Sequence, residues 1–396
     1  MYRPKSSDKK CHSALDAESS SLALIIISIL LASLMVFSFG CVKKEEKEIR
    51  IGAILPLTGD GAVYGTKEKE GIELAVEENN ATGGIRGKQI KVIFEDSKGE
   101  PAQAVSAVQK LISHDKVSVV IGDAFSSPTL AIVPIIDKNK VILMSPTASS
   151  PKLSNVSEYF FRVWPSDVAE GSVAAELAVK KLNLKKLVIL HGNNDYAIGL
   201  KEVFSKTIKE RGMEILLIEV YNEGDSDFRA QLTKIKKLSP DGIYLAGYAK
   251  EFAKILVQAK ELNIKSQFIS CGTFHEPEIL KISGKAAEGV VFVQPYFDRA
   301  SDDPNIQKFV KSYENKFGSD AGVYAAHGYD AANVIIHAMK KGGATSSEIK
   351  NILNNIKEFP GATGSITFIA GGDVIKPMRI MMVRGGQFVA FQDNKK

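Results

Sequence analysis

The chain has 396 residues, of which 44% are hydrophobic and 24% charged. A chain of this length usually needs more than one hydrophobic core, and its apolar content excludes disorder for most of the chain. The net charge is only +5 and just nine of the basic residues are arginine, which argues against a nucleic-acid partner, because phosphates and base edges favour arginine. The three cysteines, Cys11, Cys41 and Cys271, are too few and too far apart for a zinc cluster or a disulfide framework, so no metal site is expected.

The first segment of the chain indicates export. Residues 22–39 are almost wholly apolar, follow four basic residues and precede Gly40 and Cys41, as in a secretory signal. The small residues before Cys41 resemble a bacterial lipoprotein cleavage box, in which the cysteine becomes the lipidated first residue. We therefore predict a lipoprotein signal peptide over residues 1–40 and a polar tether over 41–48. The mature protein would lie in the periplasm or on the outer cell surface, anchored to the membrane by lipid on Cys41. An uncleaved signal anchor is the alternative, because such an apolar run is just long enough to cross a bilayer.

Beyond the tether, short β-branched runs alternate with longer segments of helical period, the pattern of βα units and parallel sheets. The expected strands form a first set at 49–55, 89–95, 117–122 and 141–144 and a second set at 187–191, 214–220, 242–246, 267–270 and 289–293. The expected helices cover residues 66–80, 102–114, 168–182, 197–211, 251–262, 304–317 and 321–340.

The order of these elements predicts two discontinuous lobes. The first sheet would lack helices unless residues 304–317 and 321–340 return to it, so the chain should cross between lobes near Ser166, near Gln294 and near Val374. The predicted fold class is α/β, with two doubly wound parallel-sheet lobes joined by a three-crossover hinge. Two sequential domains joined once are the alternative. The predicted limits are 49–166 plus 296–374 for lobe 1 and 167–295 plus 375–396 for lobe 2.

Small hydroxyl residues follow two strands of the first set. Ser126 comes after strand 117–122 at the start of a probable helix, and the segment Ser145 to Ser149 follows strand 141–144. Ligands of open α/β sheets gather at the carboxyl ends of strands, and a helix start offers free N–H groups that suit a carboxylate. Both loops are therefore expected to bind a ligand. The alternative is that Ser126 and Ser149 are merely helix caps.

A series of short motifs runs in order along the chain after the tether. They are Ile51–Gly59, Tyr64–Gly65, Ala75–Gly87, Val120–Gly122 with Ser126–Ser127, Ser145–Ser149, Phe161–Arg162, Asn194–Tyr196 with Gly199, Asp227–Phe228, Gly247–Tyr248, Ala287–Gly289 and Tyr329–Ala331. In order and spacing they resemble the leucine/isoleucine/valine-binding proteins of bacterial ABC transporters, which have the type I periplasmic binding fold. In that family two lobes close around one small ligand.

The resemblance implies a binding protein that is not an enzyme and carries no cofactor. It would capture an amino acid-like ligand and deliver it to the membrane permease of an ABC transporter. In the first lobe, loops would hold the ligand's carboxylate and ammonium groups, and aromatic side chains from both lobes would contact it or close over it. The implied ligand-binding residues are Ser126, Thr147, Ala148 and Ser149 in the loops, Tyr64 and Tyr324 in the first lobe, and Tyr196 and Tyr248 in the second.

One position departs from the resemblance. The family's amino-acid binders carry an acidic residue for the ammonium just after the strand that corresponds to 267–270, and here that position is Gly272. Leaving a buried ammonium unpaired would cost several kcal/mol. Either Glu276, Asp123 or Asp167 substitutes for the missing acid, or the ligand lacks an amine and is an organic acid, an amide or another small polar metabolite.

Other functions fit less well. Gly59, Gly61 and Gly65 imitate the dinucleotide loop of an NAD-dependent oxidoreductase, but the last glycine is one position late. The chain has neither the G-x-S-x-G nor the H-E-x-x-H motif of hydrolases. A sensor, in which the closed lobes signal to a partner instead of feeding a permease, remains an alternative to transport.

Overall fold

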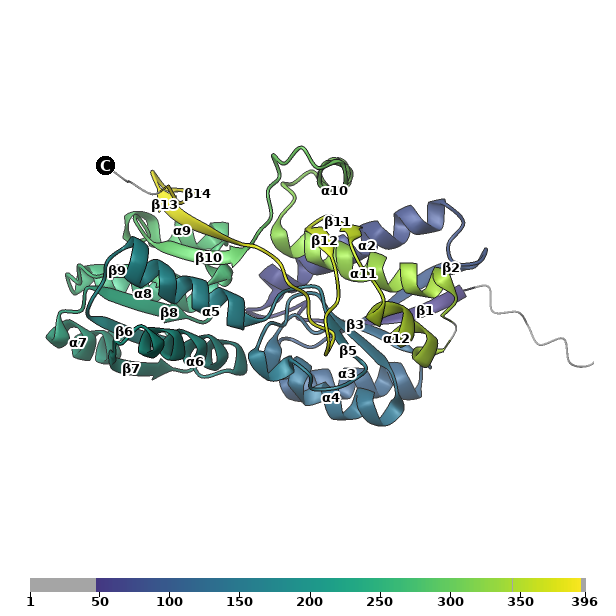
Figure 1. The fold of residues 1–396 in the computed structure, drawn as a ribbon, viewed down its shortest axis with the longest axis horizontal. Helices are drawn as coiled ribbons and strands as arrows, with labels where there is room; N and C mark the ends of the chain where they lie inside the picture. The colour runs from purple at the N-terminus through teal and green to yellow at the C-terminus, as the bar shows by residue number, and fades with distance from the viewer. Residues whose placement is uncertain (1–47, 344, 393–396) are drawn as a thin grey trace, which may run out of the picture. The chain divides into compact units, whose positions relative to one another are not determined.

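The computed structural model describes residues 48–343 and 345–392, drawn as a ribbon in Figure 1. The predicted signal peptide, most of the tether and Cys41 lie outside the described residues. Among the described residues, none of the helices has the length and apolar character needed to cross a membrane.

The first sheet is five-stranded and wholly parallel, in the order β2-β1-β3-β4-β5. Its central strands β3 and β4 are buried at every residue, as expected for a parallel sheet with helices on both faces. The strands are β1 (Glu48–Leu55), β2 (Gln89–Asp96), β3 (Val119–Gly122), β4 (Ile142–Ser145) and β5 (Phe160–Arg162), and the helices between them are α2 (Ala62–Ala81), α3 (Pro101–Ser113) and α4 (Ser126–Asn139), followed by the 3₁₀ turn η1 (Pro151–Leu153).

The second sheet has seven strands in the order β14-β13-β10-β9-β8-β6-β7. Strands β6 to β10 are parallel, whereas β13 pairs antiparallel with β10 and β14 antiparallel with β13. The strands are β6 (Leu187–Gly192), β7 (Ile215–Tyr221), β8 (Gly242–Ala246), β9 (Gln267–Ser270), β10 (Val291–Pro295), β13 (Met378–Arg384) and β14 (Gln387–Ala390). The helical segments are α5 (Asp167–Glu176), the π-helical turn η2 (Leu177–Lys181), α6 (Asp195–Glu210), α7 (Arg229–Leu238), α8 (Ala249–Glu261), η3 (Gly272–Phe274), α9 (Pro277–Ser283) and η4 (Gly284–Ala286).

The chain passes between the two sheets three times. It leaves the first sheet after β5, returns after β10, and crosses again before β13, the yellow segment that joins the second sheet in Figure 1. This is the predicted fold class of two doubly wound lobes, and it excludes two sequential domains. The returning segment contains α10 (Pro304–Phe317), α11 (Val323–Lys341), α12 (Ser346–Asn354) and the small ladder of β11 (Phe359–Gly361) and β12 (Gly364–Ile366). The exact first and last residues given above for each lobe stay a prediction.

Helices α2 and α11 cross closely because each presents a glycine at the contact. A Cβ atom on Gly71 would collide with the backbone of Ala325, and one on Gly328 with the backbone of Glu68. Only the absence of a side chain allows this approach. The crossing holds Glu68, which is fully buried, beneath the carboxyl end of β4.

The nine expected strands all exist, with ends displaced by at most two residues. Expected residues 289–293 correspond to β10, which begins later, at Val291. Expected helix 168–182 is two segments, α5 and η2. The short strand β5 and the C-terminal strands β13 and β14 were not expected.

Candidate functional site

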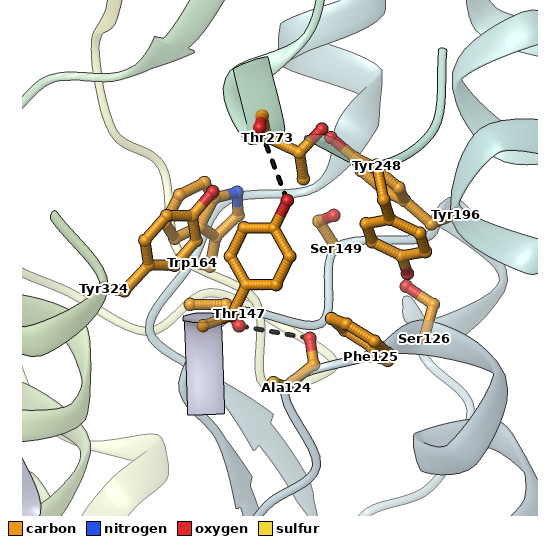
Figure 2. Close-up of a pocket in the computed structure, with 11 residues that line it drawn as sticks. Ala124, Phe125, Ser126, Thr147, Ser149, Trp164, Tyr196, Tyr248, Thr273 and Tyr324 are labelled. Carbon is orange, nitrogen blue, oxygen red and sulfur yellow. Dashed lines mark hydrogen bonds between the residues drawn. The ribbon is translucent and has the colours of Figure 1, made fainter. Parts of the chain in front are cut away.

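A small cavity lies where the carboxyl ends of strands from both sheets meet. The loops after β3, β4 and β5 and the starts of α6, α8 and η3 all contribute to it, in agreement with the rule that ligands of open α/β sheets bind at strand ends. Figure 2 shows Trp164 and Tyr324 on one side of the site, Tyr196 and Tyr248 on the other, and Ser149 between them. The lining residues are Tyr64, Ala124, Phe125, Ser126, Thr147, Ser149, Trp164, Tyr196, Tyr248, Thr273 and Tyr324.

Hydrogen bonds fix the two hydroxyl-bearing loops of the first lobe to each other. The Ser126 hydroxyl accepts from the Ser150 amide at 3.1 Å, and the Thr147 hydroxyl donates to Glu68 at 2.5 Å and lies 3.1 Å from the Ala124 carbonyl. The N-cap of α4 is Phe125, whose side chain makes no capping bond, and Ser126 is the first residue of the helix itself. Its hydroxyl therefore lies at a helix start, where free N–H groups can hold an anion.

Tyr64 of α2 connects the two lobes across the cavity. Its hydroxyl accepts from the Ala249 amide at 3.2 Å and lies 3.4 Å from the Thr273 carbonyl. Its ring packs edge-on against Tyr324, with centroids 4.9 Å apart, and against Phe125 at 5.8 Å. The site is therefore closed by contacts between side chains and backbone of both lobes.

A stack of rings completes this closure. Tyr248 of the second lobe stacks on Phe125 of the first at 4.5 Å and on Tyr196 at 5.5 Å, while Trp164 stacks on Tyr324 at 5.8 Å. These rings combine a large apolar face with a polar tip that can bond a ligand.

The space between these side chains is small. The cavity volume is about 30 Å³, room for no more than a few water molecules. Tyr64, Phe125 and Tyr248 separate it from a larger cavity of about 570 Å³. A ligand the size of an amino acid can therefore enter only when these aromatic side chains, or the lobes that carry them, move apart. The charged residues of the larger cavity are Asp60, Glu100, Glu223, Glu251, Glu276, Glu278, Lys98 and Lys250.

Four buried carboxyl groups lie close to the small cavity. Burial raises the pKa of Asp123 and of Asp167 to about 7, and raises the pKa of Glu68 and of Glu170 well above its ordinary range. Each of the four has at least one buried oxygen without a hydrogen-bond partner. The site therefore holds carboxyl groups that a cationic ligand group would stabilise in their charged form.

The structure brings together most of the residues predicted to bind a ligand. Ala148 lies behind the lining residues, with its amide bonded to the Ser145 hydroxyl at 2.9 Å. Among the predicted ammonium partners, Glu276 lines the larger cavity, where burial raises its pKa to about 8, while Asp123 and Asp167 are fully buried. The predicted residues that line the small cavity are Ser126, Thr147, Ser149, Tyr64, Tyr196, Tyr248 and Tyr324. Their roles in binding stay a prediction.

Sequence reasoning missed Phe125, Trp164, Thr273 and Glu170. Phe125 lies inside the predicted loop beside Ser126, so its position was available from the sequence. Trp164, the only tryptophan of the chain, follows the undetected strand β5. Glu170 does not line the cavity, but it accepts the amide of the distant Gly272 next to the lining residue Thr273, and no local pattern signals that contact.

Comparison with known proteins identifies the family. A sequence model described as periplasmic binding protein matches residues 48–387. The chain belongs to this family. The leucine-, isoleucine-, valine-, threonine- and alanine-binding protein of Pseudomonas aeruginosa is 28% identical over 350 residues, which cover 88% of this chain and 93% of that protein.

Two solved structures support a closer assignment within the family. The leucine-binding protein LivK of Thermotoga maritima is 30% identical with a TM-score of 0.82. LivJ of Streptococcus pneumoniae, a branched-chain amino acid transporter substrate-binding protein solved with isoleucine, is 34% identical with a TM-score of 0.81. Each match covers 87% of this chain and 98% of the other. The predicted leucine/isoleucine/valine-binding family, the type I fold and a solute-binding rather than enzymatic role are confirmed.

Proposed function

We propose that this protein captures a branched-chain or related small amino acid outside the cytoplasm and delivers it to the permease of an ABC transporter. The observation that carries the proposal is the cavity at the strand ends, where hydroxyls of the first lobe face aromatic rings of both lobes. The names of the P. aeruginosa and S. pneumoniae relatives support the ligand class.

In this proposal the first lobe binds the ligand's carboxylate. Ser126 lies at the start of α4, where backbone N–H groups and the positive end of the helix favour an anion. Thr147 and Ser149 offer further polar groups at the end of β4, and the backbone of Ala148 supports their loop. The rings of Tyr64, Trp164, Tyr196, Tyr248 and Tyr324 would surround the ligand's apolar side chain.

In this proposal the two lobes close when a ligand occupies the site. Contacts between the lobes already exist at the rim of the site: the Asp195 amide donates to the Ser127 hydroxyl at 3.1 Å, and Lys152 pairs with the Asp195 carboxylate at 2.8 Å. A ligand that bridges the two lobes would shift the population towards this closed form. The closed form is the one we expect the permease to recognise.

The ligand class is tested by thermal unfolding of protein purified after expression of the full chain. Leucine, isoleucine and valine, each at a hundred times its dissociation constant, should stabilise the protein by about 2.7 kcal/mol. D-leucine serves as a control of the same composition. If none of the common amino acids raises the melting temperature, the proposed ligand class is wrong.

Delivery and anchoring need separate tests in cells. Loss of this protein should abolish high-affinity uptake of radiolabelled ligand; unchanged uptake together with altered gene expression would favour the sensor alternative.

Labelling with radioactive palmitate should mark the intact chain and not Cys41→Ser. Labelling of both proteins would contradict lipid attachment at Cys41.

A further inference from the structure

Helix α5 carries two acidic side chains one turn apart, Asp167 and Glu170. Residues three apart lie on the same face of a helix, and here that face is turned inward, because Asp167 is 0% and Glu170 1% exposed. Oε2 of Glu170 lacks a hydrogen-bond partner, whereas the Asp167 carboxyl group lies close enough to the Ser149 side chain for hydrogen bonding to lower its pKa. Burying carboxylates without a partner costs several kcal/mol, and proteins rarely retain such groups without a compensating cation.

Glu170 is attached to the cavity through Gly272. Its Oε1 accepts the Gly272 amide at 2.9 Å. The Gly272 carbonyl lies 3.5 Å from the hydroxyl of the lining residue Tyr324, and the next residue, Thr273, lines the cavity itself. The free oxygen of Glu170 therefore lies one residue behind the cavity wall.

Gly272 leaves the space beside that oxygen free of a side chain. A Cβ atom built on Gly272 would lie 3.6 Å from Glu170 Oε2. An acidic side chain at this position would therefore begin in contact with the Glu170 carboxylate, and two like charges would repel at that distance. The carboxylate of Glu170 and a carboxylate at position 272 are thus alternatives for one place in the site.

Asp167 lies next to the lining residue Ser149. Its amide donates to the Ser149 carbonyl at 2.9 Å, and hydrogen bonding with the Ser149 side chain lowers the pKa of its carboxyl group. The neighbouring cation, Arg162, lowers the pKa of Asp167 but is committed elsewhere: its Nε donates to Asp373 at 2.7 Å and its Nη1 to the Ala148 carbonyl at 3.3 Å. In residues 48–343 and 345–392, no lysine or arginine forms an ion pair with Asp167 or Glu170.

We propose that Asp167 and Glu170 form the cation subsite of this cleft, in which Glu170 holds a primary ammonium group of the ligand. The subsite rests on the proposed function and assigns the residues that would select amino acids over amine-free acids. The hydroxyl loops of the first lobe would take the carboxylate, and α5 would take the ammonium. Amine-free organic acids of the same shape would bind weakly, because they cannot form the ion pair that an ammonium group forms with Glu170.

The test compares leucine with 4-methylpentanoate, which has the same carbon skeleton and carboxylate but no amine. Calorimetry is performed on the wild type, on Glu170→Gln and on Glu176→Gln, a control on the same helix whose side chain pairs with Lys180 and Arg211 at the surface. We expect Glu170→Gln to weaken leucine binding about thirtyfold or more. Its affinity for 4-methylpentanoate should change by less than about threefold, since a neutral amide still accepts the Gly272 bond. Glu176→Gln should bind both as the wild type does.

The outcomes separate this inference from the function on which it rests. Folded Glu170→Gln that binds leucine with wild-type affinity, or that loses affinity for both solutes equally, overturns the cation subsite. A wild type that binds only amine-free acids overturns the subsite and leaves solute capture intact. A wild type that binds neither amino acids nor organic acids contradicts the proposed function itself.

The number of protons released when the ligand binds is a second measurement, and it would not change if Asp167 and Glu170 served only to stabilise the fold. Because burial raises the pKa of both acids, an arriving ammonium should expel a proton near pH 7. Calorimetry in two buffers of different ionisation enthalpy measures that proton, and Asp167→Asn, a second variant, should reduce its release as Glu170→Gln does. Equal release in all three proteins would overturn the proposal. The other titratable or charged groups around the pair are Arg162, Tyr196, Tyr244, Tyr248, Cys271 and Tyr324.

Discussion

The two faces of the cleft are built differently. The first-lobe face presents hydroxyls that are already fixed by hydrogen bonds within the protein, such as Ser126 to Ser150 and Thr147 to Glu68. The second-lobe face presents Tyr196 and Tyr248, held mainly by ring stacking at the starts of α6 and α8. A fixed polar face can bind a solute before closure, whereas a stacked aromatic face can part and re-form. The difference suggests an order of events in which the first lobe binds and the second closes.

The fixed character of the first-lobe face depends most on Arg162, which is fully buried. Its guanidinium pairs with Asp373 and donates to the carbonyls of Ala148 and Ser150 in the hydroxyl loop. Arg162→Met should lower the free energy of unfolding by about 3–5 kcal/mol, because it leaves a charge and two carbonyls without partners. Urea denaturation measures this loss. Arg299→Met removes exposed ion pairs with Asp320 and Glu314 and should cost less than about 1 kcal/mol; equal losses would contradict a special role for Arg162.

Because Asp167 and Glu170 of α5 are buried, we predict that the unfolding free energy of the ligand-free protein falls as the pH rises. Burial raises the folded pKa of Asp167 to about 7 and raises that of Glu170 well above its ordinary range, whereas the unfolded carboxyls titrate near pH 4. The unfolded chain therefore releases these protons first, and the unfolding free energy falls between about pH 4 and pH 7. We expect Asp167→Asn combined with Glu170→Gln to reduce this fall by about 1–4 kcal/mol.

Urea denaturation of the wild type and the double variant across this pH range measures the difference. Because Asp123 also has a folded pKa of about 7, part of the fall should persist in the variant. Parallel curves for the two proteins would contradict a buried, uncompensated pair on α5. Saturating leucine should flatten the wild-type curve towards that of the variant, since the bound ammonium supplies the missing counter-charge.

Ser126 tests the polar face directly. Ser126→Ala should weaken ligand binding by about 1.5–3 kcal/mol if the hydroxyl holds an ionised group, or about ten- to a hundred-and-fifty-fold. The substitution also removes the acceptor of the Ser150 amide, so stability without ligand must be measured beside affinity. Ser106→Ala, on the exposed face of α3, is the control. Wild-type affinity in Ser126→Ala would remove Ser126 from the site.

The sequence was most informative where structure follows from local pattern. Buried runs such as Val119–Gly122 predicted the central strands, and the crevice rule placed Ser126 and Thr147 at the ends of two of them. The elements missed depend on distant partners: β13 pairs with β10, more than eighty residues earlier in the chain. Glu170 was missed for the same reason, because a glutamate in a helix is usually exposed and its contact with Gly272 spans 102 positions.

Tyr248 tests the closing face. Loss of its stacking on Phe125 and Tyr196 should cost about 0.5–1.5 kcal/mol, or about two- to twelvefold in affinity. If the second lobe closes after binding, Tyr248→Leu should express this loss mainly as faster ligand dissociation, with association changed by less than about twofold. Stopped-flow fluorescence measures both rates, and Tyr248→Phe, which keeps the ring, should behave nearly as the wild type. A slowed association with unchanged dissociation would instead mean that Tyr248 helps to form the first encounter, and the two faces would then not act in the order inferred.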